Sequence, residues 1–230
     1  DLPAKLGRKI AQLIGASPEE VLVADSTSVN LFKLALATMQ AIPERNTIIT
    51  DDLNFPSDIY VLQSTTDLVG KDSHLEILQS SDGASILLSQ LDQTIASDTA
   101  LVSLCHTAFK SGFTYDLPAV SLMANQRGSW TLWDVSHSVG VIPLDLAQTK
   151  ADLAVGCTYK FLNGGPGSPA FLYISKRRQN QIQNPISGWF GTDDPFAFDL
   201  HYQPAKGIQR FLSGTPFIVS AALMEPGIDL

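Results

Sequence analysis

A lysine and an aspartate are the residues of this chain best placed to do chemistry. Lys160 follows an apolar run at 153–155 and precedes a glycine-rich turn at 164–167. Asp134 follows another apolar run, at 129–132. An amine at a strand end can attack a carbonyl carbon, and a nearby carboxylate can stabilise a cation. Lys160 alone is more typical of a solvated loop lysine, but its combination with Asp134 favours a reactive site.

This combination indicates one cofactor chemistry. A lysine that binds an aldehyde and a carboxylate that holds a protonated pyridine are used together with pyridoxal phosphate. The turn at 164–167 lacks the lysine and the helix of a nucleotide-binding loop, so close backbone approach explains it better. His106 and His137 also follow predicted strands, but neither has the partner spacing of a zinc site. No metal site is expected.

These residues need a framework that brings them together. Apolar runs predict strands at 21–24, 47–50, 75–78, 100–104, 131–134, 153–156 and 169–174. Amphipathic stretches predict helices at 4–14, 28–40, 57–64, 85–95, 117–125 and, more weakly, 144–149. This alternation favours an α/β domain with a mainly parallel seven-stranded sheet and helices on both faces. Ligands of such sheets bind at the carboxyl ends of the strands.

Polar segments follow the first two predicted strands. Residues 25–28 (DSTS) open a helix, where hydroxyls and free backbone N–H groups favour an anion such as phosphate. Plain N-capping explains these hydroxyls equally well. Phe55 follows the second strand, where its face can stack on a flat ring. From this segment alone, a core position for Phe55 and helix capping by Ser57 are the more frequent arrangement.

The composition bounds the class of protein. With 230 residues, 44% of them hydrophobic, the chain can form one large domain. A formal net charge of −8 argues against nucleic acid or an anionic membrane as partner. No apolar stretch approaches the length of a membrane span. Cys105 and Cys157 lie in apolar contexts, which predicts free buried thiols and a cytoplasmic location. The abrupt ends predict a fragment.

Six segments together resemble the kynureninases, which are class V members of the fold-type I (aspartate aminotransferase-like) pyridoxal phosphate enzymes. The segments are 24–33, 55–58, 133–138, 157–167, 188–191 and 211–216. The resemblance runs through nearly the whole chain. Tyr159 precedes Lys160 where cysteine desulfurases and selenocysteine lyases place a histidine, which argues against desulfuration.

The resemblance implies an activity and a set of site residues. The activity is hydrolysis of L-kynurenine to anthranilate and L-alanine in tryptophan catabolism and NAD biosynthesis, with 3-hydroxykynurenine as a further substrate, in a homodimer. Lys160, Asp134 and Tyr159 are the implied catalytic residues. Lys160 binds the cofactor and moves the substrate α-proton, while Asp134 holds the pyridine nitrogen. The implied cofactor-binding residues are Thr27, Ser28, Phe55, Asp58, Cys105, Asp134, His137, Tyr159, Lys160, Trp189 and Thr215, with Trp189 and Thr215 acting across the dimer interface.

The chain also departs from the family pattern. Ala108 stands where the family has Asn, and Cys105 where it has Ser or Thr, which puts substrate choice and rate in doubt. Residues 1–215 are expected to form the cofactor domain, with 216–230 leading to a small domain outside the chain. Two alternatives remain open at this stage. One is another class V reaction, desulfuration or transamination, and the other is a silent fold that binds cofactor or a partner chain without turnover.

Overall fold

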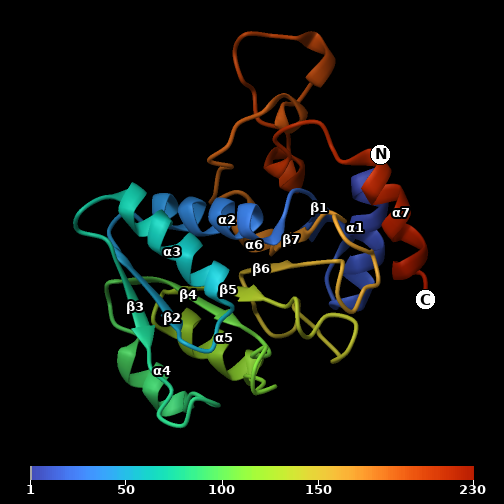
Figure 1. Ribbon diagram of the computed structural model, residues 1–230. Coiled ribbons are helices and arrows are strands. Elements are labelled where there is room, and N and C mark those ends of the chain that lie inside the picture. The colour runs from blue at the N-terminus through green and yellow to red at the C-terminus, as the bar shows by residue number, and fades with distance from the viewer. Residues whose placement is uncertain (1) are drawn as a thin grey trace.

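A seven-stranded sheet forms the centre of the protein (Figure 1). The computed structural model describes residues 2–230. The strands are β1 (Val21–Val23), β2 (Thr47–Asp51), β3 (His74–Leu78), β4 (Thr99–Cys105), β5 (Trp130–Asp134), β6 (Leu153–Gly156) and β7 (Phe171–Ile174). They lie in the order β1-β7-β6-β5-β4-β2-β3. Within the described residues, β7 alone runs against its neighbours. The expected mainly parallel sheet is therefore confirmed.

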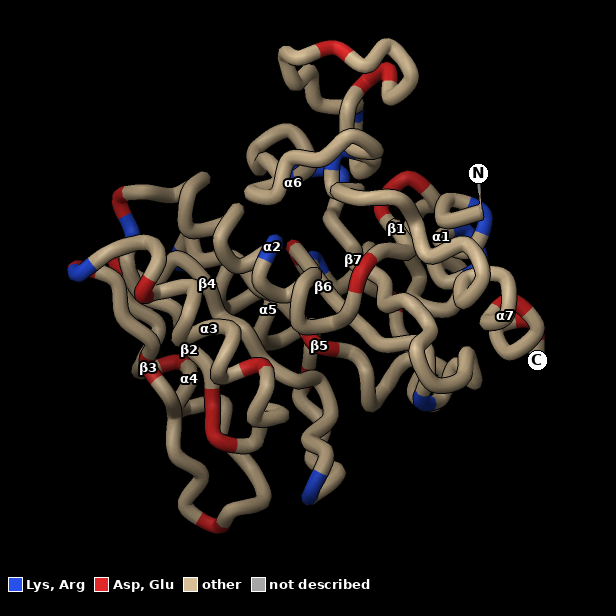
Figure 2. The backbone as a smooth tube through the Cα atoms, turned by 45° about the horizontal axis from the view of Figure 1, so that its top comes forward, with Lys and Arg blue, Asp and Glu red and all other residues tan. Residues whose placement is uncertain are grey.

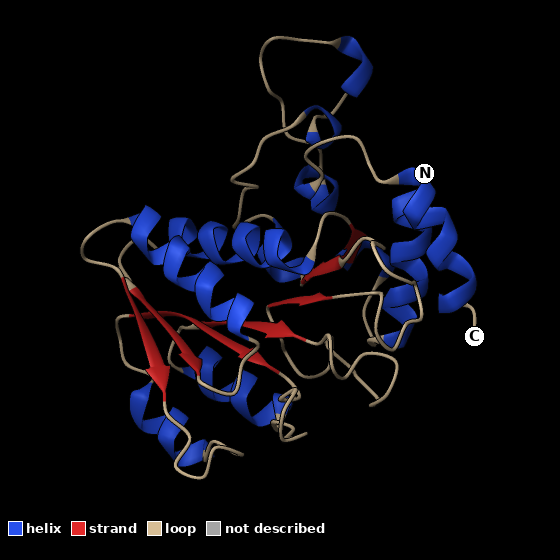
Figure 3. Ribbon diagram, viewed as in Figure 1, coloured by secondary structure: helices blue, strands red, loops and turns tan. Residues whose placement is uncertain are grey.

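Helices cover both faces of this sheet. The α-helices are α1 (Leu2–Leu13), α2 (Thr27–Ala41), α3 (Pro56–Val69), α4 (Leu88–Thr94), α5 (Leu117–Gln126), α6 (Lys176–Gln179) and α7 (Ile218–Ile228). Short 3₁₀ turns are η1 (Pro18–Glu20), η2 (Trp189–Gly191), η3 (Pro195–Ala197) and η4 (Gly207–Phe211). Figure 3 shows α2 and α3 on one face and α4 and α5 on the other. Both faces are thus covered, as the alternation predicted.

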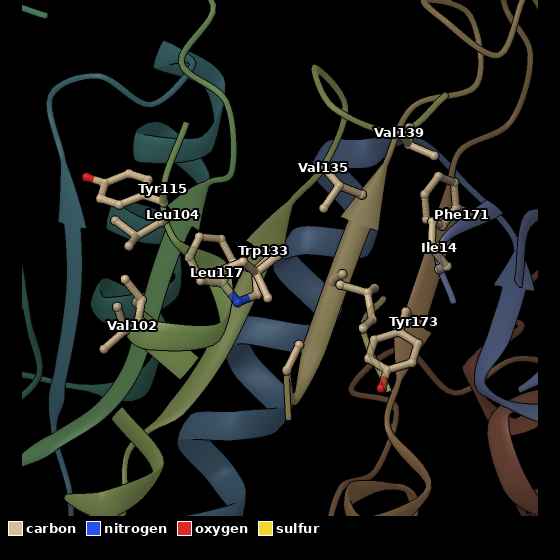
Figure 4. Packing of buried hydrophobic residues seen from close by; sticks show 14 of the residues in the cluster. Ile14, Val102, Leu104, Tyr115, Leu117, Trp133, Val135, Val139, Phe171 and Tyr173 are labelled. Atoms are coloured by element: carbon tan, nitrogen blue, oxygen red, sulfur yellow. The ribbon is translucent and has the colours of Figure 1, made fainter. Parts of the chain in front are cut away.

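The core has two layers because successive strand residues point to opposite faces. Leu132 packs in the cluster on the α2 side of the sheet, while Trp133 packs in the cluster on the α5 side. Figure 4 shows the Trp133 indole beside Leu117 of α5. The indole Nε1 also donates a hydrogen bond to Ser121 Oγ at 3.2 Å. Burial on both faces explains why the strands other than the edge strand β3 read as continuous apolar runs rather than alternating ones.

The predicted helix at 144–149 is wrong. The segment forms turns instead, because its backbone bonds to the chain that follows α1. Leu146 N–H donates to the Ile14 carbonyl at 2.8 Å, and Ala147 N–H donates to the Gly15 carbonyl. An amide that bonds to a distant carbonyl cannot also close a helical turn. Tertiary pairing therefore overrides the weak helical pattern.

Helix α7 was not predicted, and it packs along α1 (Figure 1). Lys9 bridges Glu225 at 2.6 Å and Asp229 at 2.5 Å, and Lys5 bridges Glu225 at 2.7 Å. Met224 is fully buried. Residues 218–228 thus lie on the domain itself, and a lead from 216–230 into a further domain stays a prediction.

Charged residues are spread over the molecule rather than gathered in one run (Figure 2). The segment at 187–206 projects from the sheet domain and carries the exposed side chains of Phe196, Phe198 and Leu200 (Figure 1). Among residues 2–230, no helix combines the length and the apolar character needed to cross a membrane.

Candidate active site

The candidate site lies where three neighbouring parallel strands end. Cys105 is the last residue of β4 and pairs in register with Asp134, the last residue of β5. Strand β6 ends next to them at Gly156, and the chain then continues to Lys160. Cys105 and Asp134 are almost fully buried, with 2% and 4% exposure. Because the sheet order reverses beside β4, a crevice at this edge is the expected ligand position.

A chain of polar contacts joins Lys160 to Cys105 through His137. The Nζ atom of Lys160 lies 2.7 Å from His137 Nε2, and His137 Nδ1 lies 3.6 Å from Cys105 Sγ. Burial, followed by the charge of Lys160, lowers the pKa of His137. A neutral imidazole then accepts from Lys160 at Nε2 and carries its proton on Nδ1, facing the sulfur. Cys105 Sγ in turn donates to the Thr107 carbonyl at 3.0 Å.

A hydrogen bond joins the loop after β5 to the loop after β6. Ser136 N–H donates to Asp134 Oδ1 at 2.8 Å, which fixes one oxygen of the carboxylate. Cys157 N–H donates to Ser136 Oγ at 2.9 Å, which ties the loop bearing Lys160 to the loop bearing His137. These bonds are buried, so they hold the two loops in one geometry.

The glycine-rich turn is needed for close packing, as the sequence indicated. Gly164 N–H donates to the Thr158 carbonyl at 2.8 Å. A Cβ at Gly164 would lie 2.9 Å from that carbonyl oxygen and 3.0 Å from Met224 Cβ. Gly165 and Gly167 have positive φ angles of 79° and 78°, which glycine adopts without strain. The turn therefore sets the path of the chain behind Lys160.

Three aromatic rings, those of Phe55, Tyr159 and Phe109, form a wall beside Lys160. The Phe55 ring centroid lies 5.7 Å from Lys160 Nζ, and the Tyr159 centroid lies 5.9 Å from it. Phe109 packs edge-on against Phe55 at 5.3 Å and lies nearly parallel to the His137 ring at 6.2 Å. The core position considered for Phe55 is wrong, because its side chain is 42% exposed.

The capping role considered for Ser57 is also wrong, because Ser57 lies inside α3 and Phe55 occupies the cap position. The role of Phe109 was missed in the sequence. Its place just beyond β4, on the loop that follows Cys105, was the available signal.

Hydrogen bonds from the Asn54 side chain hold the loop that carries Phe55. This role was also missed in the sequence. Its amide nitrogen donates to Thr50 Oγ1 at 2.5 Å and to the Ser103 carbonyl at 3.2 Å. Its amide oxygen accepts from the Cys105 N–H. One buried side chain therefore ties the loop that carries Phe55 to the end of β4. A polar residue in the loop after a buried strand was the only sequence signal for it.

Asp58 lies beside Asp134 in the buried part of the site. Asp58 is 4% exposed, and its Oδ2 atom has no hydrogen-bond partner among the described residues. Burial, and then the neighbouring Asp134 carboxylate, raise the pKa of Asp58 well above its ordinary range, while Lys160 opposes the rise. Burial and the same two carboxylates raise the pKa of Cys105. The pocket is therefore crowded with acidic groups around one amine.

Only one of the three hydroxyls at the start of α2 is used for capping. Ser26 is the cap, and its side chain accepts from Val29 N–H at 3.3 Å. Thr27 Oγ1 is buried without a partner among residues 2–230, and Ser28 Oγ lies 3.0 Å from Ser57 Oγ. The Thr27 hydroxyl at the helix N-terminus thus remains for an anion, beside the Ser28–Ser57 pair. The capping alternative applies to Ser26 alone.

The structure does not bring Trp189 or Thr215 to Lys160 within this chain. Trp189 packs edge-on against Phe190 and Phe196, at 4.4 Å and 6.1 Å between ring centroids. Thr215 lines a cavity that Asp25 also lines. Their contact with a neighbouring subunit's cofactor stays a prediction. Tyr159 is half exposed, and burial raises its pKa.

Two other residues at the strand ends have structural roles. The His106 N–H donates to the Asp134 carbonyl at 2.9 Å, and its ring packs edge-on against Trp133. Burial lowers the pKa of His106. Cys157 is a free buried thiol, as is Cys105, which confirms the expectation for both. Ala108 is buried and closes its loop by donating to the Phe113 carbonyl at 2.8 Å.

A mainly parallel α/β sheet with a lysine and a buried aspartate at its carboxyl edge offers the amine and the carboxylate that pyridoxal phosphate chemistry uses. The family model for aminotransferase class V matches residues 4–230, and the chain belongs to this family. Family membership supports pyridoxal phosphate as the cofactor. The present residues fit that group, because Asp134, Thr27 and the Phe55 face offer a carboxylate, an unpartnered hydroxyl and a stacking surface.

The sequence is similar to kynureninases. It is 41% identical over 234 residues to the kynureninase of Pseudomonas fluorescens. This alignment covers 100% of this chain and 55% of the Pseudomonas protein. It is 40% identical over 233 residues to the kynureninase of Burkholderia mallei strain SAVP1, and this alignment covers 100% of this chain and 54% of the Burkholderia protein. The chain thus spans about half the length of these relatives.

The fold is also found in cysteine desulfurases. The apo structure of the enzyme from Thermococcus onnurineus NA1 superimposes with a TM-score of 0.86 at 24% identity, over 99% of this chain and 56% of that one. At this identity the likeness concerns the fold alone.

Proposed function

We propose that this chain is the cofactor-binding part of a kynureninase, a hydrolase that cleaves L-kynurenine to anthranilate and L-alanine. The observation that carries the proposal is the Lys160–His137–Cys105 chain beside Asp134, in a sequence 41% identical to a kynureninase over its whole length. The proposed setting is tryptophan catabolism and NAD biosynthesis in the cytoplasm, and the proposed assembly is a homodimer.

The residues of the site suit distinct parts of this reaction. When bound, pyridoxal phosphate supplies an electron-withdrawing ring to the carbon that bears the substrate amine. Asp134 would hold a proton on the ring nitrogen, because a buried carboxylate stabilises an adjacent cation. Thr27 and Ser28 would donate to the phosphate at the start of α2. Phe55 would stack on one face of the ring.

Lys160 is the group that moves protons. Its Nζ holds the substrate α-proton after removal and returns it at a later step. His137 accepts from the same Nζ at 2.7 Å, so it keeps the amine pointed toward the crevice. Tyr159 presents a half-exposed hydroxyl at the same edge and is proposed as a donor to the phosphate. Hydrolysis of the side-chain ketone then breaks the bond between Cβ and Cγ and places the new carboxyl group on the aromatic product.

Purified full-length protein tests the substrate. With cofactor saturated, it should convert L-kynurenine to anthranilate and alanine in equal amounts. L-Cysteine should release no sulfide, and transamination with a keto acid should stay far below hydrolysis. Sulfide release that exceeds anthranilate formation would support the desulfurase alternative instead. Cofactor binding at Lys160 with no turnover of any of these substrates would support the silent fold.

A further inference from the structure

We propose a second ligand for this crevice: in the cofactor-free chain, Cys105, Asp134 and His137 form a binding site for a zinc ion. The three side chains offer a cysteine sulfur, which loses its proton when an ion binds, a carboxylate oxygen and an imidazole nitrogen. These three ligand atoms all lie within 4.8 Å of one another. The competition with the cofactor described below rests on the function proposed above, but the metal site itself does not.

The separations match what zinc requires. Zinc binds sulfur at about 2.3 Å and nitrogen at about 2.0–2.1 Å, so a tetrahedral ion separates the two atoms by about 3.6 Å. The distance from Cys105 Sγ to His137 Nδ1 is 3.6 Å. A carboxylate oxygen belongs about 3.4 Å from the nitrogen in such an ion, and the Asp134 oxygen lies within 4.8 Å, so it must move by no more than about 1.5 Å.

The backbone holds these ligands in fixed places. Cys105 and Asp134 are register partners at the ends of adjacent strands, so their side chains project to the same side of the sheet. Asp134 Oδ1 accepts from Ser136 N–H, which leaves the other oxygen for an ion. The Cys105 backbone is tied to Asn54. Ligands fixed in this way lose little freedom when an ion binds.

A second observation points to a cation at the same place. Asp58 is only 4% exposed and lies against Asp134. Its Oδ2 atom has no hydrogen-bond partner among residues 2–230. The Asp58 and Asp134 carboxyl groups and the Cys105 thiol therefore lie close enough to interact electrostatically, with Lys160 as the cationic group among them. A divalent cation would relieve their repulsion.

The donor set selects the ion. Magnesium and calcium prefer a shell of oxygen ligands, whereas one sulfur, one nitrogen and one carboxylate suit zinc. Three protein ligands leave the fourth tetrahedral position to water. Cys105 is the residue that completes this set. A serine or threonine at this position would leave only two strong zinc ligands.

Zinc and pyridoxal phosphate should exclude each other. Both would use Asp134, the ion as a ligand and the cofactor as the partner of its ring nitrogen. A zinc ion on His137 Nδ1 would also place the ring proton on Nε2, facing Lys160 Nζ at 2.7 Å. That amine is the group to which the cofactor aldehyde bonds. Loading with zinc should therefore slow cofactor uptake.

Cobalt(II) and zinc titrations of the cofactor-free protein test the site. Wild type should bind one ion per chain and show the near-ultraviolet charge-transfer band of a cobalt–thiolate bond. Cys105→Ser should lose the band, and both Cys105→Ser and His137→Gln should weaken zinc binding more than about tenfold. The matched controls, Cys157→Ser and His106→Gln, should keep wild-type band and affinity. Circular dichroism of each variant verifies that it is folded.

Three results would overturn the metal site. They are absence of stoichiometric binding by wild type, a band that survives in Cys105→Ser, and a band that disappears in Cys157→Ser. A last titration adds pyridoxal phosphate at rising concentration, which should raise the apparent dissociation constant for zinc in proportion. An unchanged constant would contradict the shared use of Asp134, and with it the cofactor position, while leaving the metal site intact.

Discussion

Lys160 Nζ and His137 Nε2 lie 2.7 Å apart although they come from loops after different strands, β6 and β5. The pair forms because a hydrogen bond from Cys157 N–H to Ser136 Oγ joins the two loops. Since the pKa of His137 is lowered by burial and by Lys160, the imidazole is a neutral acceptor at neutral pH. The site therefore holds its amine in a fixed direction, against His137 and over the Phe55 ring.

Asp134→Asn should nearly abolish turnover while the protein stays folded. The amide oxygen can still accept from Ser136 N–H, so the loop should keep its shape. The neutral side chain cannot stabilise a protonated ring nitrogen, so the rate with cofactor saturated should fall by orders of magnitude. Steady-state kinetics of the full-length protein check this. Asp116→Asn, which retains the cap of α5, is the matched control and should keep wild-type rates. Wild-type turnover in Asp134→Asn would exclude the role.

Asp58→Asn should stabilise the cofactor-free protein at neutral pH. Because the folded-state pKa of Asp58 lies above its ordinary value of 3.8, its stabilising contribution is complete below about pH 3.8 and is lost as the pH rises through the folded-state pKa. Asparagine does not ionise, so the variant does not lose this stability as the pH rises. The variant should therefore be more stable than wild type at pH 7 and equally stable near pH 4.

Thermal unfolding at both pH values measures this difference. The control Asp67→Asn changes an exposed residue on the same helix and should stay within about 0.5 kcal/mol of wild type. A gain of equal size at both pH values would contradict the explanation by ionisation.

Asn54→Ala should weaken both the fold and cofactor binding. The change leaves the Cys105 N–H and the Ser103 carbonyl without their buried partner, at a cost of about 2–4 kcal/mol in the free energy of unfolding. It also frees the loop that carries Phe55. Urea unfolding and a cofactor titration measure the two effects. Asn46→Ala removes an exposed bond to the Asp72 carbonyl and should cost less than about 1 kcal/mol, with unchanged cofactor affinity.

Cofactor binding and dimer formation should be linked. If Thr215 contacts the phosphate in a neighbouring subunit, pyridoxal phosphate should shift the monomer–dimer equilibrium toward the dimer. Thr215→Ala should weaken both by about 1–2 kcal/mol, the scale of one hydrogen bond to a charged group. Sedimentation velocity with and without cofactor measures the shift. A fully active monomer would contradict the linkage.

Much of the sheet could be predicted from the sequence, because strands buried on both faces leave continuous apolar runs. The positions of Asp134 and Cys105 at strand ends, and of Lys160 in the loop after β6, followed from the same runs. Contacts between distant segments could not be predicted. The turn at 144–149 depends on carbonyls after α1, and α7 depends on ion pairs with Lys9.

The same limit applies within the site. Asn54 holds the end of β4 from a loop about fifty residues away, and Phe109 reaches both Phe55 and His137. The Cys105, Asp134 and His137 cluster joins residues from two strands and a loop, so no local spacing reveals it. The residues were visible in the sequence, but their meeting depends on the fold.

The most direct test of the central claim is to locate the lysine that binds the cofactor. Protein loaded with pyridoxal phosphate is reduced with borohydride, digested and mapped by mass spectrometry. The reduced pyridoxyl group should lie on the peptide that contains Lys160, and Lys160→Ala should lose both the label and the visible absorbance band of the bound cofactor. A label on a different lysine, or a band that persists in Lys160→Ala, would contradict the assignment of the site.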